Sequence, residues 1–306
     1  MDSQFPDTRN IVNPFIIEPT SKHTHSFIIL HPTGITGEGF GKKMKDEYLC
    51  SDGEGLIQKF PCARFIFPTT PPRQPVISNP ESCEEFDAID PNYGPAQRLM
   101  ARRIMSLIDQ EALTIGRENV ILGSSARAIV LSCFLACRFR IGGFIGLNVL
   151  TEHWPSIGQG YNNKDKKTYN LHPDDDKEAT VDDEILEMGI REFDRVVTHC
   201  RRQLGLDVVD ISSINDTSIG TPVFIGYYDS TCRVCERLSD LGYKVTSKSY
   251  IQRERDWTPE QMDDIVEFLQ DRVNLCPRNI WIMIYMLRII RSMGMWWLHF
   301  MAYNYH

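Results

Sequence analysis

The chain lacks an uninterrupted apolar run long enough to cross a bilayer. A membrane-spanning helix needs about 18 to 20 consecutive apolar residues, and the most apolar stretch, 280–300, is interrupted by Arg288 and Arg291. The polar start, Met1 to Pro6, also lacks the apolar core of a secretory signal peptide. We therefore expect a cytoplasmic protein.

An excess of basic charge is also missing. The chain has 33 Lys and Arg residues against 41 Asp and Glu residues, which gives a formal net charge of -8 at pH 7. A protein that binds nucleic acid must present cations to the phosphate backbone. This charge balance argues against a nucleic-acid partner.

The cysteines form no paired pattern typical of a disulfide framework or a zinc site. Their number, nine, is odd, so we expect reduced thiols. Cys232 and Cys235 have the C-x-x-C spacing of a redox centre or of half a zinc site, but the sequence has no second C-x-x-C. We predict no metal site and no cofactor.

A chain of 306 residues and 35.2 kDa can bury one large core. We expect a flexible lead-in over 1–22, one domain over 23–274 with an exposed polar insertion at about 159–183, and an apolar, aromatic tail over 275–306. Three interpretations of this tail stay open: a segment buried against the domain or a partner, an amphipathic segment at a membrane surface, or a tail from an altered reading frame.

Apolar strands and amphipathic helices alternate along the chain, which is typical of an α/β fold with a mostly parallel sheet covered on both faces. An edge strand is expected near Ile16. Further strands are predicted at 26–30, 63–68, 120–122, 141–149, 221–226 and 243–250. Helices are predicted at 98–110, from the turn after the strand at 120–122 through 137, and at 184–203, 235–241 and 258–270.

The stretch 120–131 joins an apolar strand to an apolar helix through a Gly-Ser turn. A nucleophile elbow has the pattern G-x-S-x-G, whose small residues let the serine hydroxyl stand clear of the sheet edge. Gly123 and Ser125 fit this pattern, whereas Arg127 replaces the second glycine. The alternative is an ordinary strand-loop-helix junction. The loop 31–37 could present backbone N–H groups to an anion or be a plain turn.

Six collinear segments together resemble the acyl-protein thioesterase and carboxylesterase/lysophospholipase family of α/β-hydrolases, in particular its fungal-type members. The resemblance covers roughly residues 24–270 and implies the α/β-hydrolase fold. The segments that carry it are the loop 27–37, Arg64 to Pro71, Glu85-Phe86-Asp87, 120–125, Thr221 to Gly226, and Asp256-Trp257 followed by 262–265.

The resemblance implies a Ser-Asp-His triad, of which this chain keeps the serine. Ser125 holds the position of the nucleophile, Thr231 that of the acid and Asp256 that of the base. The H-G before the acid has become Tyr227-Tyr228. The backbone N–H groups of Thr33 and Ala126 match the oxyanion hole. Because a carboxylate is a poor general base for a serine hydroxyl, the triad is degenerate in sequence.

Asp229 and His153 are possible substitutes for the missing acid and base, whereas His31 is expected to support the loop that it opens. Arg127 could bind an anion. The sequence favours a family member that hydrolyses acyl esters or thioesters, including those of a lipidated protein, weakly or not at all. The alternatives are a non-catalytic ligand-, membrane- or protein-binding pseudohydrolase and an intact esterase with a rearranged triad. Peripheral membrane contact through 276–306 is one of the alternatives that stay open.

Overall fold

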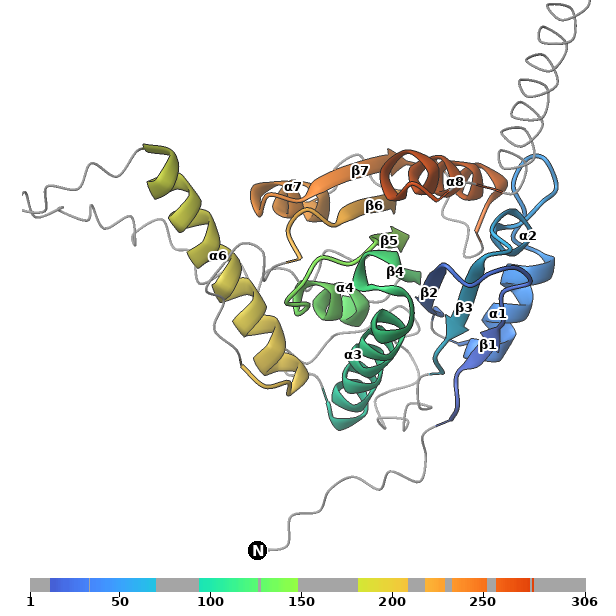
Figure 1. Cartoon of the computed structure of the whole chain (residues 1–306), viewed down its shortest axis with the longest axis horizontal. Helices are drawn as coiled ribbons and strands as arrows, with labels where there is room; N and C mark the ends of the chain where they lie inside the picture. The colour runs from blue at the N-terminus through green and yellow to red at the C-terminus, as the bar shows by residue number, and fades with distance from the viewer. Residues whose placement is uncertain are drawn as a thin grey trace, which may run out of the picture.

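The computed structural model describes residues 12–32, 34–69, 94–125, 128–147, 181–208, 218–228, 233–251, 257–275 and 277. These residues form a sheet with helices on both faces (Figure 1). In chain order the elements are β1 (Phe15–Ile17), β2 (His25–Leu30), α1 (Gly37–Asp46), α2 (Leu56–Lys59), β3 (Ala63–Phe67), α3 (Pro95–Ile115), the short 3-10 helix η2 (Arg117–Asn119), β4 (Val120–Ser125), α4 (Ala128–Leu135), β5 (Gly143–Leu147), α6 (Val181–Leu204), β6 (Pro222–Tyr227), α7 (Arg233–Asp240), β7 (Lys244–Ser249) and α8 (Pro259–Val273).

The seven strands of this sheet lie in the order β1-β3-β2-β4-β5-β6-β7. The short first strand runs antiparallel to its neighbour, and the other pairs of neighbouring strands in the order are parallel. Parallel strands need crossover connections, and here these are largely helical, so helices cover both faces of the sheet. This is the sheet of the α/β-hydrolase fold expected from the sequence.

The central strand is β4, with three strands on each side. Every residue of Val120–Ser125 is buried. Its register with β2 ends at the pair Leu30↔Ser124, and its register with β5 ends at Ser125↔Leu147. A strand that is covered on both faces reads as a continuous apolar run, which is why the sequence alone located this strand.

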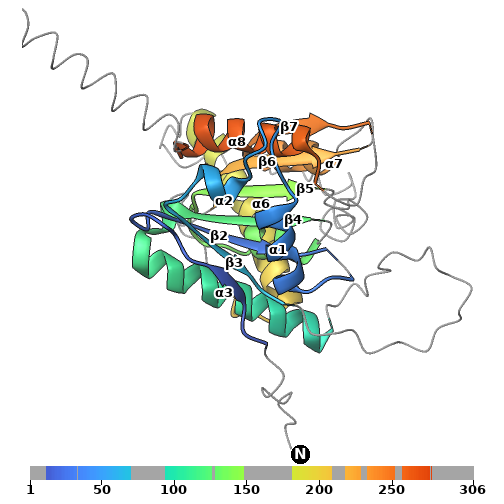
Figure 2. The ribbon, with the colours of Figure 1, turned by 90° about the vertical axis from the view of Figure 1, so that its right-hand side faces the viewer.

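Successive side chains of the inner strands enter two different cores. On β2, Phe27 and Ile29 pack on one face, whereas Ile28 and Leu30 pack on the other. The first face is covered by α1, α2 and α8, and the second by α3, α4, α6 and α7. Figure 2 shows the sheet between these two layers.

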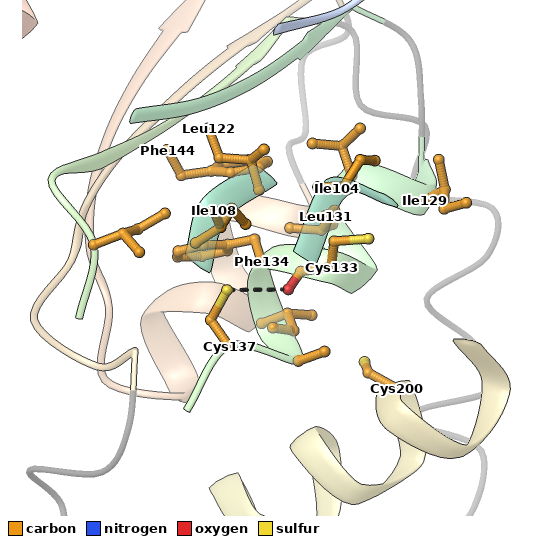
Figure 3. Packing of buried hydrophobic residues seen from close by; sticks show 14 of the residues in the cluster. Ile104, Ile108, Leu122, Ile129, Leu131, Cys133, Phe134, Cys137, Phe144 and Cys200 are labelled. Atoms are coloured by element: carbon orange, nitrogen blue, oxygen red, sulfur yellow. Dashed lines mark hydrogen bonds between the residues drawn. The ribbon is translucent and has the colours of Figure 1, made fainter. Parts of the chain in front are cut away.

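Three of the buried cysteines belong to the second core. Cys133 lies on α4, Cys137 follows two residues after the end of this helix, and Cys200 lies on α6. All three are fully buried among apolar side chains such as Phe134 (Figure 3). The Cys137 thiol donates to the carbonyl oxygen of Cys133 at 3.3 Å. Burial raises the pKa of Cys137 and of Cys200 to about 12. These thiols are therefore neutral packing groups.

The expectation that all the cysteines are reduced is wrong for Cys235, which is disulfide-bonded. The free cysteines among the described residues are Cys50, Cys62, Cys133, Cys137 and Cys200. Because these five are free, the partner of Cys235 is one of the cysteines outside the described residues.

Helices α1 and α2 were not expected from the sequence. Helix α1 contains three glycines, which weaken helix propensity, but a side chain at two of these positions would collide with the sheet. A Cβ at Gly37 would meet the carbonyl oxygen of Phe67, and one at Gly41 would lie 2.5 Å from the ring of Phe15. The glycines allow α1 to lie close to β3 and β1.

Within the described ranges, the helices are too short or too polar to span a bilayer. The polar insertion at about 159–183 and the tail lie outside these ranges, apart from Val181 to Asp183 in the backbone of α6 and residues 275 and 277. The edge strand expected near Ile16 is β1, which pairs with β3 through Ile16↔Ile66.

Candidate functional site

The carboxyl ends of the parallel strands meet at one edge of the sheet, where open α/β sheets bind their ligands. His31 follows β2, Ser125 ends β4, and Tyr228 follows β6. Tyr250 follows β7 and donates its backbone N–H to the carbonyl oxygen of Tyr227 at 2.8 Å. The topology therefore gathers residues from four distant parts of the sequence at this edge.

Ser125 stands where β4 turns toward α4, which is the place of the nucleophile in an elbow. It is 3% exposed, and its neighbour Ser124 is fully buried. Ser124 pairs with Leu30 of the second core, so the next side chain, that of Ser125, lies on the face of the first core. There its neighbour on β5 is the apolar Leu147.

The loop after β2 is fixed at both of its ends. The Nδ1 atom of His31 lies 2.7 Å from the carbonyl oxygen of Pro32. The hydroxyl of Thr36 caps α1 by accepting from the backbone N–H of Gly39 at 3.0 Å. The backbone N–H of Gly37 donates to the Thr69 hydroxyl beyond β3 at 3.1 Å. These contacts hold the start of α1 near the site edge.

A hydrogen-bonded pair joins the end of β6 to α8. The side-chain amide of Gln261, which is 1% exposed, donates to the Tyr228 hydroxyl at 2.9 Å. Its oxygen accepts the backbone N–H of Thr258 at 3.2 Å, which completes a capping box at the start of α8. The first turn of α8 is thus tied to the loop that the family resemblance assigns to the acid.

Ionisable groups in this region lie toward β7. The Tyr250 hydroxyl donates to a carboxylate oxygen of Asp264 at 2.9 Å, and the other oxygen of Asp264 lies 2.8 Å from the Lys248 ammonium. Burial, followed by the hydrogen bond to Asp264, raises the pKa of Tyr250 well above its usual range. Tyr250 is therefore a neutral donor at physiological pH.

Trp257 immediately follows the sequence position of the base. It is 6% exposed and stacks on Tyr48, with ring centroids 6.0 Å apart, and edge-on against Phe40. Its indole Nε1 is buried without a hydrogen-bond partner among the described residues. Aromatic packing therefore fixes the chain where it leaves the segment that contains position 256.

The structure places Ser125 but not the rest of the predicted site. Ser125 lies at the carboxyl end of the central strand, as expected. The other predicted residues lie outside the described residues: Thr33, Ala126, Arg127, His153, Asp229, Thr231 and Asp256. Within the described ranges, no group of three or more His, Cys, Asp or Glu side chains could hold a metal ion.

Sequence reasoning missed two features of this edge. One is the contact between Tyr228 and Gln261, whose sequence signal is weak because the capping box already accounts for a Gln at the third position of α8. The other is the position of His31 next to the strand of Ser125. Each strand end was visible in the sequence, but the order of the strands was not.

Comparison with known proteins finds matches among solved structures and none by sequence. No protein-family model matches the chain, and no curated protein matches its sequence. Its fold is similar to that of a SOBER1 variant from Arabidopsis thaliana, at 15% identity and a TM-score of 0.47 over 82% of this chain and 99% of that one. It is also similar to Zea mays acyl-protein thioesterase 2, at 12% identity and 0.46 over 85% and 99%. A phospholipase/carboxylesterase from Dyadobacter fermentans matches at 14% identity and 0.43 over 83% and 93%. Identities and scores of this size assign no activity to this chain.

Proposed function

We propose that this chain is a serine hydrolase of low turnover that cleaves acyl esters or thioesters through Ser125. The observation that carries the proposal is the position of this serine, the last residue of the central parallel strand, separated by two residues from the start of α4. A hydroxyl at this point of an α/β-hydrolase sheet faces the edge at which substrates bind.

Low turnover follows from the residues at the other two triad positions. Thr231 and Asp256 stand where the family resemblance places the acid and the base. In serine hydrolases, loss of a triad member typically lowers kcat by about 10⁴, and binding and the oxyanion hole supply the catalysis that remains. The family resemblance supports an acyl thioester, such as that of a lipidated protein, as the substrate class, and a cytoplasmic location.

The first test is turnover of p-nitrophenyl acetate and of an acyl thioester by the protein and by Ser125→Ala. We expect slow hydrolysis that disappears in the variant, and labelling of Ser125 by a fluorophosphonate probe. The matched control is Ser106→Ala on the outer part of α3, which should leave both readings unchanged. Turnover that survives in Ser125→Ala would contradict the proposal.

A second candidate function is binding without turnover. The observation that favours it is the replacement of the H-G before the acid by Tyr227-Tyr228, with the Tyr228 hydroxyl held by Gln261. The double variant Thr231→Asp, Asp256→His separates the two functions. A parent that equals Ser125→Ala, combined with a double variant that gains turnover, would favour a pseudohydrolase, and the tail 276–306 would then be tested for membrane contact with lipid vesicles.

A further inference from the structure

The strand register places one histidine beside Ser125. Leu30 of β2 pairs with Ser124 of β4, and the next residues along these two parallel strands are His31 and Ser125. Neighbouring strands are about 4.8 Å apart. His31 is the first residue beyond β2, so its backbone lies close to that of Ser125 at the carboxyl edge of the sheet.

The alternation of side chains puts both residues on the same face. Ile29 belongs to the first core and Leu30 to the second, so the following residue, His31, returns to the face of the first core. Ser125 lies on that face as well, since it pairs with Leu147. Trp257, next to the sequence position of the base, is also part of this core.

The other described histidines are far from this edge in the fold. His23 and His25 lie at the amino end of β2, and His199 lies on α6, which covers the opposite face of the sheet. Within the described residues, His31 is thus the imidazole nearest to the end of β4.

The contact with Pro32 fixes the tautomer of this imidazole. A carbonyl oxygen can only accept a hydrogen bond, so His31 Nδ1, 2.7 Å from it, carries the proton. In the neutral ring, Nε2 then has the lone pair that accepts a proton. In a Ser-His-Asp triad a carboxylate holds the histidine in this same tautomer. The ring is 1% exposed, so its orientation is set by the protein.

We propose that His31 is the general base for Ser125, in place of the histidine that the sequence lacks at position 256. This inference rests on the proposed function and assigns its missing base. No hydrogen bond to the Ser125 hydroxyl is formed within the described part of the chain, and catalytic hydrogen bonds often tighten only when substrate is bound.

Ser125 and His31 together account for every proton transfer in the reaction. Ser125 Oγ attacks the acyl carbon as its proton moves to His31 Nε2, and the electron pair of the C=O bond moves to the oxygen. When the tetrahedral intermediate collapses, the leaving thiolate or alkoxide takes the proton from Nε2. Water then attacks the acyl-enzyme with His31 as base, and the carboxylic acid and free Ser125 are formed.

The Pro32 carbonyl also accounts for low turnover. It keeps the ring in the required tautomer, but as a neutral dipole it stabilises the imidazolium less than a carboxylate does. The reaction is therefore expected to be slower than that of an intact triad, although Ser125 remains activated.

The experiment compares the full-length protein with His31→Gln and with the matched control His25→Gln, which replaces a histidine at the opposite end of the same strand. The readout is the rate of fluorophosphonate labelling at Ser125 between about pH 5 and pH 9, together with thioester turnover. A general base contributes roughly 10²- to 10⁴-fold, so His31→Gln should label and turn over at least about 100-fold more slowly. It should also lose the rise of rate through the imidazole range near pH 6.5. His25→Gln should match the parent.

The outcomes separate the two proposals. If Ser125 labels and turns over substrate in the parent and His31→Gln, melting as the parent does, keeps its rate and pH profile, the assignment of the base is wrong and the proposed function stands. If the parent shows no Ser125-dependent reaction, the proposed function itself fails. If His31→Gln melts at a lower temperature than the parent, its rate is not used, and the pH profile of the parent tests the inference instead. A parent labelling rate without an inflection near the imidazole pKa range then overturns the inference. Recovery of rate when Thr231→Asp and Asp256→His are added to His31→Gln supports it.

Discussion

The buried carboxylate of Glu111 is the centre of a hydrogen-bond network at the amino edge of the sheet, opposite Ser125. Glu111 on α3 is 5% exposed and accepts from the Ser26 hydroxyl at 2.5 Å and from Arg64 at 2.9 Å. Arg64 also donates to Glu18 at 2.8 Å. His23 Nε2 lies 2.9 Å from the Ser26 oxygen, which completes a chain of hydrogen bonds between α3, β2 and β3. These contacts hold the edge opposite the candidate site.

We expect Glu111→Gln to lower the free energy of unfolding by about 2 to 3 kcal/mol, because the neutral amide no longer balances the charge of Arg64 and has one acceptor oxygen where the carboxylate has two. Urea denaturation measures the effect. Glu18→Gln serves as the control, since the Glu18 side chain is 65% exposed and an exposed ion pair contributes less than about 1 kcal/mol. Equal losses in the two variants would show that burial of Glu111 adds nothing.

At the scale of elements, the reactivity of the buried thiols measures how tightly α4 and α6 pack together. The thiolate is the form that reacts with alkylating agents, and burial raises the pKa of Cys137 and of Cys200 to about 12. We expect the native protein at neutral pH to be alkylated at Cys62, which is half-buried, and not at Cys133, Cys137 or Cys200.

Mass mapping after iodoacetamide treatment checks this prediction. The same protein in urea is the control, because all of its free thiols should then react. Rapid modification of Cys200 in the native state would mean that α6 leaves α4 readily. It would also contradict the close packing of the second core.

The elements were predictable where one physical signal dominated. Continuous apolar runs located β2, β4 and β6, and the capping residues Thr258 and Gln261 located the start of α8. Helix α1 was missed because Gly37 and Gly41 lower helix propensity, and the reason for them, close packing on β3 and β1, exists only in the folded chain. The signals for it were Thr36 as a cap and Phe40 and Met44 four residues apart.

The candidate site was predictable in part for the same reason. Gly123 and Ser125 mark the end of an apolar strand by local chemistry, so the position of the serine at the end of β4 followed from the sequence. The proximity of His31 depends on β2 lying next to β4, and strand order is a long-range property that no local pattern encodes. The disulfide of Cys235 was missed because an odd number of cysteines favoured reduced thiols.

At the scale of the whole molecule, two half-buried histidines link stability to pH. Burial, with a smaller effect of His23, lowers the pKa of His25, and burial with a smaller effect of Arg202 lowers that of His199. In the unfolded chain both return to about 6.5. Between 6.5 and the lowered values the unfolded chain binds more protons, so stability is complete above about pH 6.5 and is lost as the pH falls through this window.

We expect the urea midpoint of the protein to fall between about pH 7.5 and pH 5.5, and to fall less in His199→Leu, which removes a ring nitrogen that is buried without a partner among the described residues. One such group contributes at most about 1.4 kcal/mol per pH unit. Chemical denaturation at the two pH values is the measurement. An identical loss in parent and variant would show that His199 protonates equally well in both states.

The strand β7, at the edge of the described sheet, is where another copy of the chain could add a strand. It pairs with β6 and ends the strand order, so its outer backbone groups could template the strand of another chain, which is how aggregates grow. Unlike the apolar runs of the inner strands, β7 carries Lys244 and Lys248 and no fully buried residue. A second copy approaching in register would bring the two Lys244 side chains together and would crowd the ion pair of Lys248 with Asp264. The charges of β7 therefore disfavour fibre-like stacking.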